Sequence, residues 1–87
     1  MLAWQVLYEG FGLILNGVPN SFSMFGFVMA SDLNDVHHQV IRVAMQDPVF
    51  RQHQGDPSSL VFNPQEIYER PDLGTIEREE LEIEIDA

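Results

Sequence analysis

Apolar positions alternate with other residues at both ends of the chain, and this period of two predicts β-strands. The alternating apolar residues at the start are Leu2, Trp4, Val6 and Tyr8. Trp, Val and Tyr are also residue types favoured in strands. Gly10 and Gly12 come next and predict a bend or bulge before the strand continues. Near the end of the chain, Leu81, Ile83 and Ile85 alternate with acidic residues, which predicts a strand better than a helix.

The first strand is expected to form a hairpin with a second strand at residues 22–30. The connection, NGVPNS at residues 16–21, is rich in turn residues and predicts a loop longer than a two-residue turn. The second strand, FSMFGFVMA, is almost continuously apolar. Such a run is typical of a strand that is covered on both faces.

A helical period follows the second strand. The apolar residues that share one broad helix face are Leu33, Val36, Val40, Ile41, Val43 and Ala44. Ser31 is the expected N-cap, and Asp32 and Asp35 suit the positive end of the helix. Pro48 disfavours helical geometry in the residue before it, so the helix is expected to end near Gln46.

The rest of the chain predicts a loop and then further strands. Val49 and Phe50 are expected beneath the helix end, and short strands are expected at residues 60–62 and 65–70, interrupted by Asn63-Pro64. The order β-β-α-β-β predicts a small α+β fold, an antiparallel sheet with one amphipathic helix packed on one face. Residues 1–87 are expected to form a single domain, with an acidic C-terminal strand or tail at residues 75–87. One helix covers one sheet face, so either loops or a partner, including a second copy of the chain, must cover the other.

Charge narrows the choice of partner. The net charge is -10, there is no lysine, and residues 66–87 hold nine acids and two arginines. This field repels nucleic acid and anionic lipid and attracts basic surfaces, so neither direct nucleic-acid binding nor membrane binding is expected. The apolar runs are too short to span a bilayer, and no basic residue precedes the first one as in a Sec-type signal. The lack of cysteine excludes disulfides and thiolate metal sites and suits a cytoplasmic location.

Candidate catalytic and metal-binding residues are few. His37 and His38 point about 100° apart on a helix, so they do not easily chelate one ion together. His38 and His53 with a carboxylate remain an alternative metal or enzyme site. Ser58, His53 and Asp56 are close in sequence, but this does not predict triad geometry. The expectation is therefore a non-enzyme without catalytic residues, metal or cofactor.

The acidic end is the best candidate for a partner site. On a strand, four carboxylates lie on one face about 6.6 Å apart, close to the phosphate step of an extended nucleic-acid strand. These residues are Glu80, Glu82, Glu84 and Asp86. Glu66, Tyr68 and Glu69 on the preceding strand complete the predicted site, with Ile67 and Phe62 as further candidate anchors. The alternative interpretation is an edge strand whose charges prevent sheets from joining edge to edge.

In size, acidity and lack of a catalytic set, the chain is similar to immunity and inhibitor proteins, such as toxin antidotes. The leading hypothesis is a small acidic binding module that blocks a basic protein partner, such as a toxin or a nucleic-acid-handling enzyme. One alternative is an assembly module that forms a homodimer through exposed strands or an apolar sheet face. The other is the small metal protein or enzyme that uses His38 and His53.

Overall fold

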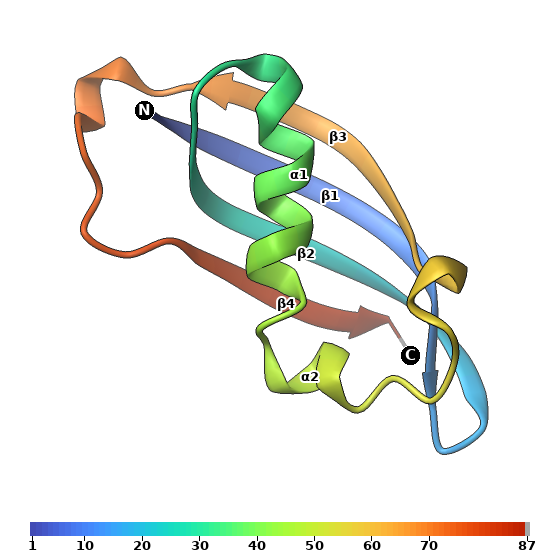
Figure 1. Ribbon diagram of the computed structural model, residues 1–87. Helices are drawn as coiled ribbons and strands as arrows, with labels where there is room; N and C mark the ends of the chain where they lie inside the picture. Colours follow the sequence, from blue (N-terminus) through green and yellow to red (C-terminus); the bar gives the residue numbers. More distant parts are fainter. Residues whose placement is uncertain (87) are drawn as a thin grey trace.

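The computed structural model describes residues 1–86, which form one antiparallel sheet covered on one face by helices (Figure 1). The strands are β1 (Leu2–Leu15), β2 (Val18–Ala30), β3 (Val61–Glu69) and β4 (Glu80–Asp86). The helices are α1 (Leu33–Ala44) and α2 (Pro48–Arg51), with short 3-10 turns η1 (Pro57–Ser59) and η2 (Pro71–Leu73). The strand order is β3-β1-β2-β4, so the predicted α+β class is confirmed. Ala87, the last residue of the predicted acidic segment, lies outside the described residues.

The β1–β2 hairpin turns tightly at Asn16 and Gly17. Leu15 pairs directly with Val18, and the two turn residues have φ angles of 53° and 77°. Asn-Gly is the favoured pair where both φ angles must be positive, because the twist of this turn matches that of the strands. The predicted longer loop is therefore wrong. The predicted irregularity after Gly10 is confirmed, since the register shifts before Leu13.

Helix α1 is capped one residue later than predicted. The Asp32 carboxylate accepts a hydrogen bond from the backbone N–H of Asp35 at 2.9 Å, so Asp32 is the N-cap instead of Ser31. The Asp35 carboxylate reaches back to the N–H of Ser31 at 3.0 Å. This reciprocal pair satisfies two backbone donors at the start of the helix.

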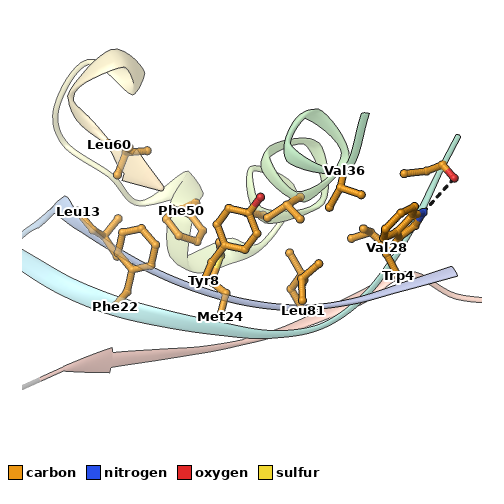
Figure 2. Packing of buried hydrophobic residues seen from close by; sticks show 14 residues of the cluster. Trp4, Tyr8, Leu13, Phe22, Met24, Val28, Val36, Phe50, Leu60 and Leu81 are labelled. Carbon is orange, nitrogen blue, oxygen red and sulfur yellow. Dashed lines mark hydrogen bonds between the residues drawn. The ribbon is translucent and has the colours of Figure 1, made fainter. Parts of the chain in front are cut away.

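The core lies between the sheet and the helices (Figure 2). Helix α1 buries Val36, Val40 and Ala44, whose spacing of four places them on one side. Phe50, expected in a loop, is buried by the short helix α2 and meets Phe22 edge-on with ring centroids 5.0 Å apart. Leu33 was predicted to share the apolar helix face, yet it is 58% exposed.

Strands β3 and β4 form the two edges of the sheet. β3 runs unbroken through Asn63-Pro64, so the two predicted short strands are one. Proline is tolerated here because an edge strand has one row of amides that needs no partner. β4 pairs with β2, and its Leu81 lies opposite Gly26 and is buried, which confirms the strand interpretation of residues 80–86. Residues 70–79 carry the chain between the two edges, and no helix within residues 1–86 has the length and apolar character to cross a membrane.

Candidate functional site

The sheet face turned away from the helices is the candidate site, and we call it the open face. Side chains alternate between the two faces along a strand. Val6 and Tyr8 of β1 are buried in the core, so Leu7 between them points to the open face. Figure 2 shows the buried side chains gathered on the helix side of the sheet.

An apolar strip occupies the two central strands of the open face. It consists of Leu7, Phe25, Phe27 and Met29. Leu7 lies directly opposite Phe25, and the rings of Phe25 and Phe27 are 6.4 Å apart. Phe25 remains 45% exposed, although it belongs to a central strand. Exposed apolar surface of this kind, bordered by polar residues, marks interaction sites.

Carboxylates border the apolar strip along β4, whereas the border on β3 has one carboxylate, Glu66, followed by Tyr68 and by Arg70, which donates to Oε1 of Gln5 at 2.6 Å. In one row across the sheet, Glu66, Leu7, Phe25 and Glu82 are successive neighbours on β3, β1, β2 and β4. The outer strands of the sheet are about 14 Å apart, because each strand spacing is about 4.8 Å. The row therefore has two apolar side chains at its centre and one carboxylate at each end.

The border on β4 is a continuous line of acids, which we call the acid row. It consists of Glu80, Glu82, Glu84 and Asp86. Their partners on β2 are Phe27, Phe25, Ser23 and Ser21, all on the open face. All four acids are exposed. A hollow of about 180 Å³ lies between the acid row and the strip, lined in part by Leu7, Phe25, Glu82 and Glu84.

The ion pairs of the described chain leave the acid row without a cation. Arg42 pairs with Glu79 at 2.6 Å, and Arg70 pairs with Asp72 at 2.8 Å. Neither pair uses an acid of the row. Bonds from the Arg70 guanidinium hold the pKa of Asp72 below its ordinary value. The four carboxylates of the acid row are therefore available to a basic partner.

His53 has a structural role in the loop before β3. Its Nδ1 accepts a hydrogen bond from the N–H of Ile14 at 3.0 Å, so the neutral ring carries its proton on Nε2. Nε2 lies 3.1 Å from the carbonyl oxygen of Asp56 and 3.2 Å from Oγ of Ser59. The ring thus ties the loop to β1, and no nitrogen is left to take a proton from a serine. Ser58 instead donates to the Asp56 carboxylate at 2.8 Å.

The other histidines lie apart from His53. Nδ1 of His37 is 3.0 Å from the hydroxyl of Tyr8. Burial raises the pKa of that tyrosine. His38 is exposed on α1. Among residues 1–86, no three His, Asp or Glu side chains are grouped as a metal site would require.

The structure places six of the seven predicted site residues on the same sheet face, although on its two opposite edge strands. Glu66 and Tyr68 lie on the open face, as the acid row does, and Tyr68 is 53% exposed. Glu69 pairs with Trp4, whose side chain is in the core, so Glu69 points to the helix side. Ile67 and Phe62, considered as anchors from sequence, pack against the core and are not on the open face.

Sequence reasoning missed the centre of the site. Leu7, Phe25 and Phe27 were not among the predicted binding residues. The signal was present, because FSMFGFVMA has apolar residues at both odd and even positions. Strand alternation requires one of these sets to face away from the helix. The near-continuous apolar character of β2 therefore reflects a core on one face and an exposed strip on the other.

Comparison of the chain with protein-family models, curated proteins and solved structures gave no match.

Proposed function

We propose that the protein is a non-enzymatic binding module that holds a basic protein partner on its open face and thereby blocks that partner. The observation that carries the proposal is the apolar strip with the acid row along one side and Glu66 on the other. Protein interfaces combine an apolar centre with a polar rim in the same way. On this proposal the protein acts in the way that immunity and inhibitor proteins do.

Each part of the open face has a physical role in this proposal. The net charge of -10 steers a cationic surface toward the protein and accelerates association. Phe25 and Tyr68 are exposed aromatic residues, the type that most often supplies binding energy at interfaces. Because Glu66 and the acid row lie on the edge strands, their carboxylates keep contact with water while they pair with the partner. This avoids the desolvation cost of a buried ion pair.

Self-association through the same strip is less favoured. A two-fold interface brings identical patches together. Two open faces whose acid rows meet would repel one another, because neither Arg42 nor Arg70 forms an ion pair with an acid of the row. We therefore expect a monomer at low ionic strength. Sedimentation that showed a stable dimer would favour the assembly alternative.

The experiment that tests the proposal compares capture of cellular proteins by the wild-type protein and by the variant Glu80→Gln/Glu82→Gln/Glu84→Gln. A partner must bind stoichiometrically to the wild type, be released by salt, and be lost in the variant. The purified partner must then lose its activity when the wild-type protein is added. Glu69→Gln is the matched control, because it removes one carboxylate that lies outside the open face.

The absence of any salt-sensitive partner, or a partner that binds the triple variant equally well, would contradict the proposal. If a partner binds but keeps its activity, the protein is still a binding module, but it does not block its partner.

A further inference from the structure

We infer that the segment of the partner seated on the open face is a basic amphipathic α-helix, whose apolar stripe has several lysines or arginines on the side that faces the acid row and one opposite Glu66 on the other side. This inference rests on the proposed function and specifies its partner. Three features of the open face support a helix: its width, the position of its charges and the length of its apolar strip.

The width of the face suits a single helix. The outer strands β3 and β4 are about 14 Å apart, and an α-helix with its side chains is about 10–12 Å in diameter. A helix laid over β1 and β2 therefore contacts Leu7 and Phe25 while Glu66 and Glu82 lie along its two sides. An amphipathic helix has the same arrangement as this row, with an apolar stripe between polar positions.

The position of the charges disfavours a second sheet. A sheet stacked on the open face would cover all four strands and bury Glu66 and Glu82 beneath its own side chains. The free energy lost when charges are removed from water often exceeds the free energy gained when they pair. A helix leaves these carboxylates at the rim. Lysine and arginine can then lay their aliphatic stems on the apolar strip and keep their charged ends in water.

The length of the strip matches a short helical motif. Phe25 to Met29 covers four residue steps of β2, or about 13 Å. Helix residues at i, i+3 or i+4, and i+7 span about 10 Å. The acid row extends the charged border to about 20 Å, the length of about 13 helical residues.

Strand addition at the free edge of β4 is the competing geometry. A basic strand at that edge would also be attracted to the acid row. It would leave Phe25 and Leu7 uncovered, because these residues lie on the two central strands. The exposed apolar strip therefore favours the helix over the added strand.

The test uses two model peptides of about 14 residues, long enough for about 20 Å of helix. They have equal numbers of leucine and lysine and the same composition. One places leucines at helical spacing, and the other alternates leucine with lysine to favour a strand. Calorimetry measures affinity, and difference circular dichroism measures the helix content gained on binding. A helical-spacing peptide with a central proline controls for helix formation.

We expect the helical peptide to bind one to one, gain helicity, and bind about tenfold more tightly than the strand peptide and the proline peptide. Phe25→Ser should weaken binding of the helical peptide about tenfold, because it removes the central aromatic contact. Leu33→Ser is the matched control, since Leu33 is also exposed but lies on α1. In the unaltered protein, the amide resonances of Leu7 and Phe25 should shift, whereas those of α1 should not.

The outcomes separate the inference from the proposed function. If the strand peptide binds as tightly as the helical one, or if the resonance shifts are confined to β4, the helix inference is overturned and a basic partner still stands. If Phe25→Ser has no effect while Glu80→Gln/Glu82→Gln/Glu84→Gln abolishes binding, attraction is by charge alone and the helix inference also fails. If the substitutions of the triple variant weaken the binding of neither peptide, the proposed function fails as well.

Discussion

Arg42 of helix α1 and Glu79 form an ion pair of 2.6 Å that fixes the chain just before strand β4. The second carboxylate oxygen of Glu79 accepts a hydrogen bond from the backbone N–H of Met29 at 2.9 Å. The Glu79 side chain therefore connects the segment just before β4 to helix α1 and to the end of β2. The acid row begins at the next residue, so its position depends on this connection.

Replacing Glu79 should loosen β4. Glu79→Ala removes both contacts and is expected to lower the free energy of unfolding by about 1 kcal/mol, of which the partly exposed ion pair supplies less than the amide acceptor. Hydrogen exchange should become faster at Met29 and along β4. Arg42→Met removes only the ion pair and should have a smaller effect. Unchanged exchange at Met29 would contradict this account.

Neutralising the acid row should leave the fold as stable as before or more so. Acids of the row are about 6.6 Å apart and repel one another, so Glu80→Gln/Glu82→Gln/Glu84→Gln relieves repulsion. Thermal unfolding at low salt should occur at the same or a higher temperature than in the wild type. At about 1 M salt the difference should vanish, because the Debye length is then about 3 Å. A lower unfolding temperature in the variant would show that the carboxylates serve the fold.

Acid should remove the contribution of Asp35 to stability. The hydrogen bond from the backbone N–H of Ser31 holds the pKa of Asp35 below its ordinary value. A depressed pKa in the folded state adds stability above the unfolded value, and this is lost as the pH falls through the folded one. The difference in urea midpoint between the wild type and Asp35→Asn should therefore be largest above about pH 5. It should shrink as the pH falls below that value. Glu77→Gln, at an exposed position, is the control. A gap that does not vary with pH would mean that the charge of Asp35 is not involved.

Removing His53 should destabilise the loop before β3. His53→Ala leaves the N–H of Ile14 without its acceptor, and the expected loss in the free energy of unfolding is about 1 kcal/mol. Urea unfolding and exchange of the Ile14 amide measure the effect. His38→Ala changes an exposed histidine and should have almost none. Equal effects of the two substitutions would argue against the tie between the loop and β1.

The parts of the fold that local pattern decides were predictable. Alternation of Leu81, Ile83 and Ile85 predicted β4, and the spacing of Val36, Val40 and Ala44 predicted α1. The two-residue turn was also readable, since Asn-Gly between strands favours it. It was obscured by the neighbouring Pro19 and Asn20, which lie within β2.

The faces of β3 could not be predicted by counting residues. The register between β1 and β3 shifts between Leu7 and Tyr8, so Gln65 is an extra residue in β3. The shift reverses which positions point to the core. Phe62 faces the core, whereas Tyr68 lies on the open face although both numbers are even. A bulge depends on the pairing of two strands distant in sequence, which periodicity in one strand does not reveal.

The tight turn at Asn16-Gly17 also has a consequence for how the protein reaches its native state. The β1–β2 hairpin needs only contacts between near neighbours, whereas β4 must return to β2 across about 60 residues. The hairpin carries all four residues of the apolar strip, and β4 carries the acid row. A hairpin formed first would present apolar side chains on both faces and an unpaired edge on β2, which favours aggregation. Arrival of β4 closes that edge and adds the charges, so the same acids that attract a partner also protect the folding chain.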